Sequence, residues 1–121
     1  MKKMLLITKD EVKVVETNGL DDYYKLIECD TIDIAYRSIG GKAFDIICDD
    51  EGLLKEGMRV SAVKVTGEPA LVGNLIVCGE ADEEGEETSL TEADIELIKE
   101  NIIKAMFTDM TVGNLLIIEE I

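Results

Sequence analysis

A pair of glycines between two strand-like stretches is the feature that most limits how this chain can fold. Gly40-Gly41 separates "TIDIAYRSI" from "KAFDIICD". The first stretch has the two-residue alternation of a strand. Two adjacent glycines can both adopt the positive φ angles that a tight two-residue turn requires. The sequence therefore predicts an antiparallel hairpin over residues 31–49.

Other short apolar runs predict further strands. Strands are expected in "MLLIT", "VKVVET", "NLIVCGE" and "TVGNLLIIEEI", and the first two form a second hairpin across Lys9-Asp10-Glu11. A further strand is expected between the turn signals Glu56-Gly57 and Thr66-Gly67-Glu68-Pro69.

Two segments have the spacing of amphipathic helices. One is "LDDYYKLIEC", with two acidic residues near its N-terminus. The other is predicted to begin at Ser89, because Ser89 and Glu92 have the spacing of a capping box, and to end near Phe107. Its apolar stripe consists of Ile95, Ile98, Ile102, Ala105 and Met106. Together the elements predict an α+β fold, in which a mostly antiparallel β-sheet packs with two helices in a single domain over residues 1–121.

The charge of the chain is strongly negative. It has 27 acidic and 12 basic residues and a formal net charge of −15. Direct nucleic-acid binding is not expected, because it requires a basic surface. We expect instead either simple solubility or attraction to a basic partner. The absence of an 18-residue apolar run and of a signal peptide predicts a cytoplasmic protein that does not span a membrane.

The residues needed for common chemistries are scarce. The chain has no histidine, and its three cysteines, Cys29, Cys48 and Cys78, are widely spaced, as expected for small buried residues. No catalytic residue, cofactor-binding residue or metal ligand is predicted, and the protein is expected not to be an enzyme.

The acidic segment "DDEG", residues 49–52, is interpreted as a turn that ends a strand. A calcium loop of the EF-hand type with Gly52 as its sixth residue would begin at Ile47, which has no side-chain ligand. With Gly85 as the sixth residue, the loop would end at Thr91 instead of glutamate. A weak, irregular divalent-cation site at either acidic loop remains an open alternative.

Acidic residues concentrate between residues 80 and 100, where an exposed loop precedes the second predicted helix. Glu92, Glu96 and Glu100 lie four residues apart, which places three carboxylates on one helix face about 6 Å apart. The predicted partner-binding residues are these three glutamates together with Asp82, Glu83 and Glu84 of the loop. Such a row resembles a line of phosphates, so the expected partner is a basic host protein.

Two other functions remain open at this stage. A small-molecule or nucleotide-binding protein would need polar anchors in a pocket, for which Arg37, Arg59, Tyr23 and Tyr36 are the candidates. A structural or assembly subunit would form a homo-oligomer, for which "NLLIIEEI" is the candidate edge strand.

Three short motifs resemble those of a family of small uncharacterised proteins, a domain of unknown function. The motifs are "CDDEGLL" (48–54), "VGNLIV" (72–77) and "SLTEADI" (89–95). The resemblance covers most of the chain up to Met106, but Met58-Arg59 stands where many members have Asn-Arg. Members are encoded by bacterial phages, plasmids and integrative elements, which implies a role against host defence. The resemblance brings no established activity.

Overall fold

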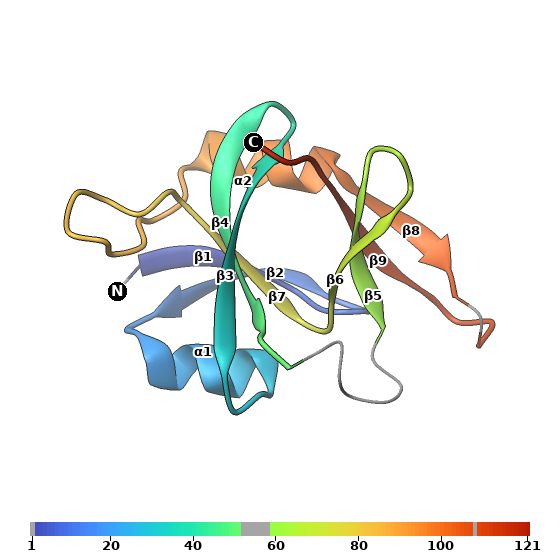
Figure 1. Cartoon of the computed structure of the whole chain (residues 1–121), viewed down its shortest axis with the longest axis horizontal. Helices are drawn as coiled ribbons and strands as arrows, with labels where there is room; N and C mark the ends of the chain where they lie inside the picture. Colours follow the sequence, from blue (N-terminus) through green and yellow to red (C-terminus); the bar gives the residue numbers. More distant parts are fainter. Residues whose placement is uncertain (1, 52–58, 108) are drawn as a thin grey trace.

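Nine strands in two sheets and two helices make up the described part of the protein, residues 2–51, 59–107 and 109–121 of a computed structural model (Figure 1). Sheet A has the order β2-β1-β7-β4-β3, and sheet B has the order β6-β5-β9-β8. The strands of sheet A are β1 (Lys2–Ile7), β2 (Val12–Thr17), β3 (Ile32–Ile39), β4 (Lys42–Asp49) and β7 (Leu75–Cys78). Those of sheet B are β5 (Val60–Lys64), β6 (Pro69–Val72), β8 (Ile102–Met106) and β9 (Val112–Ile118). The helices are α1 (Leu20–Ile27) and α2 (Glu92–Glu100).

The hairpin around the two glycines is confirmed. Ile39 pairs with Lys42, and Gly40 and Gly41 have φ angles of 61° and 89°. Gly40 is required for a second reason, because a Cβ atom at this position would lie 2.6 Å from Cδ1 of Leu97 on α2. The turn therefore packs closely against the second helix.

The predicted α+β class is confirmed, with the strands divided between two sheets. All pairs in sheet A are antiparallel, including the predicted β1–β2 hairpin. Sheet B contains one parallel pair, β5 with β9. The predicted strand after Glu56-Gly57 is β5, whereas β6 was not predicted because Gly67-Glu68-Pro69 was interpreted as a turn.

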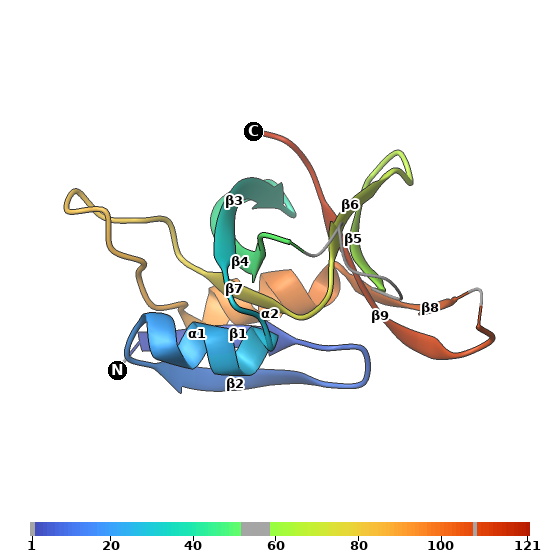
Figure 2. The ribbon, with the colours of Figure 1, turned by 60° about the horizontal axis from the view of Figure 1, so that its bottom comes forward.

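Sheet A is covered on both faces by apolar side chains. On one face Leu5, Phe44 and Ile46 join a core shared with sheet B and α2. On the other face Met4 and Ile47 pack against α1, which lies beside the β1–β2 hairpin in both views (Figures 1 and 2). The short helix α1 is stabilised by this packing, because a helix of this length is not stable alone.

The predicted limits of the second helix are wrong at both ends. The N-cap is Thr91, whose hydroxyl accepts from the Asp94 N–H while the Asp94 carboxylate accepts from the Thr91 N–H. The helix ends at Glu100, and the side chain of Asn101 donates to the Leu97 carbonyl at 2.9 Å. Ile102 then begins β8, which pairs along its length with β9.

The predicted apolar stripe is divided by this helix end. Ile95 and Ile98 are buried beneath α2, whereas Met106 of β8 is 64% exposed. The prediction that the segment "NLLIIEEI" provides a free edge strand is also wrong, because β9 lies between β5 and β8 inside sheet B.

Candidate functional site

The acidic loop between β7 and α2 has a defined shape. The Oδ1 atom of Asp82 accepts hydrogen bonds from the N–H groups of Glu84 (2.9 Å) and Glu86 (3.0 Å). Gly85 completes the turn with a φ angle of 81°. Asp82 thus organises the loop, while the side chains of Glu83 and Glu84 are exposed as predicted. Figure 1 shows the loop extending from one end of the molecule.

The three predicted glutamates of α2 are all exposed. Glu92 lies 3.5 Å from Lys3, but its side chain is 84% exposed, so this ion pair stabilises the fold little. Within the described residues, Glu96 and Glu100 have no cationic partner in an ion pair. The helix therefore presents two carboxylates that no cation in the described part of the chain neutralises.

The loop and the start of α2 are fixed to the first strand. The Leu90 N–H donates to the Lys3 carbonyl at 2.8 Å, and the Lys3 N–H donates to the Ser89 hydroxyl at 3.1 Å. Lys2 forms an exposed ion pair with Glu86 at 3.4 Å. Glu92 consequently begins α2 close to the returning end of the loop.

The six predicted partner-binding residues form an elongated surface. Glu92 and Glu100 lie at opposite ends of α2, about 12 Å apart along the helix axis at 1.5 Å per residue. We call the surface formed by Asp82, Glu83, Glu84, Glu92, Glu96 and Glu100 the acidic surface. Its extended form suits a long partner surface better than a small ligand.

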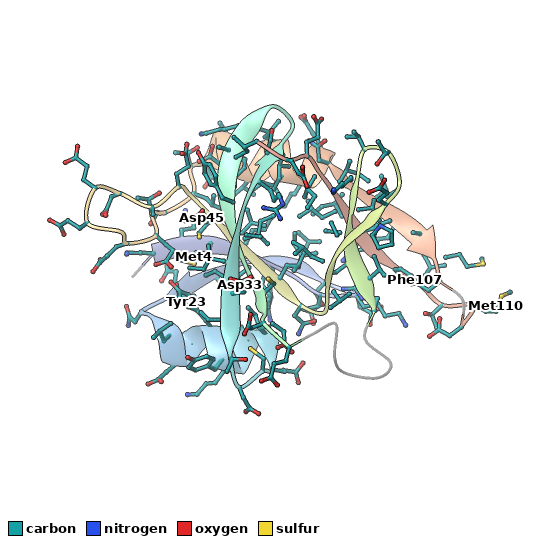
Figure 3. The ribbon with its side chains drawn as sticks, viewed as in Figure 1. Met4, Tyr23, Asp33, Asp45, Phe107 and Met110 are labelled. Carbon is teal, nitrogen blue, oxygen red and sulfur yellow. The ribbon has the colours of Figure 1, made fainter. Side chains whose placement is uncertain are left out.

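The four candidate anchors for a small ligand do not line one common cavity of the described residues. Tyr23 belongs to α1 and is buried against sheet A (Figure 3), whereas the Tyr36 hydroxyl donates to Glu80 at the surface at 2.6 Å. Arg37 donates to the Tyr36 carbonyl and lines a cavity of about 290 Å³ between β3, β4 and β6. Tyr23 lines a different cavity, of about 310 Å³, near the start of α1.

Arg59 lies apart from the other three anchors. It donates to the Asn114 carbonyl at 2.7 Å, and its guanidinium carbon lies 5.7 Å from the centre of the Phe107 ring. One of its terminal nitrogens is buried and has no hydrogen-bond partner among the residues that the structure describes. Burial lowers the pKa of this guanidinium from its ordinary value. These contacts fix Arg59 in the fold near the β8–β9 hairpin.

The model of one protein family matches residues 1–103 of the chain. That family is described as a domain of unknown function, DUF3846. The chain belongs to the DUF3846 family. The match confirms that the resemblance is to a domain of unknown function; the origin in phages or mobile elements stays a prediction. No curated protein and no solved structure matches the chain.

The DUF3846 match ends at the second residue of β8, so most of the β8–β9 hairpin lies outside it. Two of the three motifs are placed by the described residues. "VGNLIV" forms the end of β6 and the start of β7, and "SLTEADI" forms the cap and first turn of α2. Within the described parts of the chain, no helix is long and apolar enough to cross a membrane.

The three cysteines of the DUF3846 chain are buried, as predicted. Burial, with neighbouring carboxylates, raises the pKa of Cys48 to about 11 and that of Cys78 to about 12. These two thiols are therefore protonated at neutral pH, and a protonated thiol is a poor nucleophile.

The acidic segment after β4 forms a turn in its described part. The Asp49 carboxylate accepts from the Glu51 N–H at 2.9 Å, and the Asp50 N–H donates to the Thr31 carbonyl at 3.1 Å. Gly52, for which a turn conformation was predicted, lies outside the described residues. Among the residues that are described, no group of three or more acidic or cysteine side chains has the geometry of a metal site.

Two buried carboxylates were missed by the sequence reasoning. Asp94 is 6% exposed and bonds to Lys42 as well as capping α2. Asp45 is 7% exposed and accepts from the Ala81 N–H at 3.0 Å, at the start of the acidic loop. Desolvation raises the pKa of Asp45, and the carboxylates of Glu87 and Glu80 add to the effect.

Proposed function

We propose that this protein is a non-enzymatic binding protein whose acidic surface docks on a basic surface of another protein. The observation that supports it is the row of exposed carboxylates along α2, of which Glu96 and Glu100 have no cationic partner among the described residues, on a chain with a net charge of −15. Glu92, Glu96 and Glu100 repel one another at four-residue spacing, which costs the helix a few tenths of a kcal/mol per pair. Partner binding would offset that cost.

The chemistry of the surface favours a partner that normally binds nucleic acid. Carboxylates repeated along α2 resemble a row of phosphates, and a basic cleft built for phosphates attracts both. The proposed partner is a basic host protein in the cytoplasm, and the proposed role is that of an anti-defence or DNA-mimicking accessory protein of a mobile element. That role follows from the family resemblance by analogy, and the charge pattern is consistent with it.

The triple change Glu92→Gln, Glu96→Gln and Glu100→Gln is expected to abolish partner binding. The measurement is a pull-down from bacterial lysate with the tagged protein, eluted in salt steps and then with competing DNA. The bound partner is expected to be released between about 0.1 and 1 M salt, because the Debye length falls from about 10 Å to about 3 Å over this range.

A control with the same loss of charge elsewhere separates a local site from general electrostatics. The variant Glu16→Gln, Asp21→Asn and Asp30→Asn changes three exposed acids on β2 and around α1. It is expected to retain the partner. If the α2 variant binds as well as the parent, or if the control loses binding equally, the acidic surface is not the binding site.

A further inference from the structure

Side chains of β3 form hydrogen bonds with the backbone groups on the unpaired edge of the same strand. The N–H and C=O groups of Ser38 bond to Glu119 and therefore point away from β4. Because these groups alternate along an antiparallel strand, the N–H and C=O groups of Ile34 and Tyr36 also point to the open edge. The Ile34 N–H is capped by the carboxylate of Asp33 at 2.9 Å. The Tyr36 carbonyl is capped by the guanidinium of Arg37 at 2.9 Å. Both groups are thereby withdrawn from pairing with another strand.

The other end of β3 and two further edge strands are protected from pairing with another chain by different means. Ser38 forms two backbone hydrogen bonds with Glu119, at 2.8 and 2.9 Å. The edge strand β6 begins with Pro69, which has no N–H, and its pairing with β5 is irregular. The edge strand β2 carries two exposed charged residues, Lys13 and Glu16. Charges, proline and irregular pairing are the usual means of preventing edge-to-edge association.

The edge strand β8 lacks comparable protection among the described residues. Its sequence is "IIKAM", and Ile103 and Met106 are 48% and 64% exposed. At the two ends of β8, the Asn101 carbonyl accepts from the Ile117 N–H and the Phe107 N–H donates to the Thr111 carbonyl. Because backbone groups alternate in direction along a strand, those of Ile102, Lys104 and Met106 point away from β9. An apolar strand with a free row of backbone donors and acceptors is a site for strand addition.

The charge of the β8–β9 hairpin also differs from that of the rest of the molecule. Residues 102–118 contain one base, Lys104, and one acid, Asp109, whereas the whole chain has a net charge of −15. Met110 and Val112 add further exposed apolar surface, and Met110 lies at the projecting end of the hairpin (Figure 3). Two copies repel each other over most of their surfaces but can approach at this hairpin.

We propose that two copies of this chain associate through their β8 edges, in antiparallel orientation about a two-fold axis. A register centred on Ala105 places Lys104 opposite Met106 of the second copy and Ile103 opposite Phe107 of the second copy. A register centred on Lys104 would place two like charges opposite each other, which is destabilising. Sheet B then continues across the two-fold axis as one sheet of both copies.

Sedimentation equilibrium of the parent and two variants tests the association. The parent is expected to form dimers that strengthen from about 0.1 to 1 M salt, because salt screens the repulsion between copies. Ile103→Glu is expected to raise the dimer dissociation constant about tenfold or more, because it buries a charge in the contact. Val14→Glu is the matched control, since Val14 is 44% exposed on the edge strand β2 of the other sheet.

A cysteine at the two-fold axis tests the register. Ala105 would face its copy in a non-hydrogen-bonded pair with Cα atoms about 4.5 Å apart, which is within the range of a disulfide. Ala105→Cys is expected to give a disulfide-linked dimer on mild oxidation, and Val14→Cys and the parent, whose own thiols are buried, are expected not to. Circular dichroism would confirm that each variant is folded.

Three outcomes would overturn the proposal. The first is a parent that stays monomeric at both salt concentrations. The second is a folded Ile103→Glu variant that dimerises like the parent. The third is a partner from the lysate that the Ile103→Glu variant no longer binds, while the parent is a monomer. The last would assign the β8 edge to a strand of another protein. The opposite salt dependence separates this association from partner binding by the acidic surface, which salt weakens.

Discussion

Replacing Leu116 with alanine is expected to lower the free energy of unfolding by about 2–5 kcal/mol. Leu116 is fully buried on β9, where it pairs with Ala62 of β5 and Ile102 of β8. Its side chain belongs to the core shared by both sheets and α2. Truncation therefore leaves a cavity between the two sheets. Urea unfolding followed by circular dichroism gives the change directly.

The neighbouring leucine provides a matched control. Leu115 is only partly buried and lies on the opposite face of β9, so Leu115→Ala is expected to cost clearly less than Leu116→Ala. Equal costs for the two variants would show that β9 does not pack as described. The comparison matters for the family, because β9 lies beyond the residues that match DUF3846 and still completes the core.

The change Asp94→Asn is expected to destabilise the protein by about 1–2 kcal/mol at neutral pH, because asparagine keeps an acceptor for the Thr91 N–H but loses the charge-assisted hydrogen bond with Lys42. Burial opposes ionisation of Asp94, but hydrogen bonds from Lys42 and Thr91 outweigh it and lower its pKa below the ordinary value. The ionised carboxylate stabilises the fold at pH values above the pKa of this aspartate in the unfolded chain, which is near 3.9. This contribution is lost as the pH falls through the lower, folded pKa.

The measurement is the free energy of unfolding of parent and variant between about pH 7 and pH 3. The difference between them should be largest near neutral pH and should shrink in acid. A difference that does not depend on pH would show that the ionised form of Asp94 is not what stabilises the cap.

The other buried aspartate provides a control with the opposite sign. Burial raises the pKa of Asp45, so its ionised form disfavours folding at pH values above the folded pKa. Asp45→Asn keeps an acceptor for the Ala81 N–H and is expected to leave stability at neutral pH unchanged or higher. Any gain should disappear as the pH falls toward the ordinary value near 3.9.

Local signals in the sequence predicted the elements whose structure is set locally. Gly40-Gly41 predicted the β3–β4 hairpin because few residue pairs tolerate two consecutive positive φ angles. The two-residue alternation of "IDIAYRSI" predicted a strand, and in β3 Ala35 and Ile39 share the face that is directed into the shared core.

The end of α2 depends on contacts distant in sequence. Ile102, Ala105 and Met106 fit a helical period as well as they fit a strand, and short apolar segments do not distinguish the two. Pairing with β9 decides in favour of a strand. Asn101 and the adjacent β-branched Ile102 and Ile103 were the local signals that favoured a helix end. The parallel pairing of β5 with β9 has no signal in the sequence of either strand.

The sequence predicts the exposure of the candidate site residues better than it predicts the hydrogen bonds and ion pairs of their neighbours. Glutamates are rarely buried, so the exposure of Glu83, Glu96 and Glu100 follows from composition. The burial of Asp94 does not, because it depends on Lys42 in another part of the chain. Asp82 precedes Gly85 in a pattern typical of a turn, which could have identified it as the organiser of the loop.

The position of β9 between β5 and β8 has a consequence for how the chain folds during synthesis. All five strands of sheet A precede residue 79, so this sheet can pair while later residues are still being added. Sheet B cannot close until residues 112–118 have left the ribosome, since β9 is the strand that joins its two halves. Until then Phe44 and Ile46 lack part of the core that covers them, and the nascent chain exposes an apolar surface of the kind that chaperones bind.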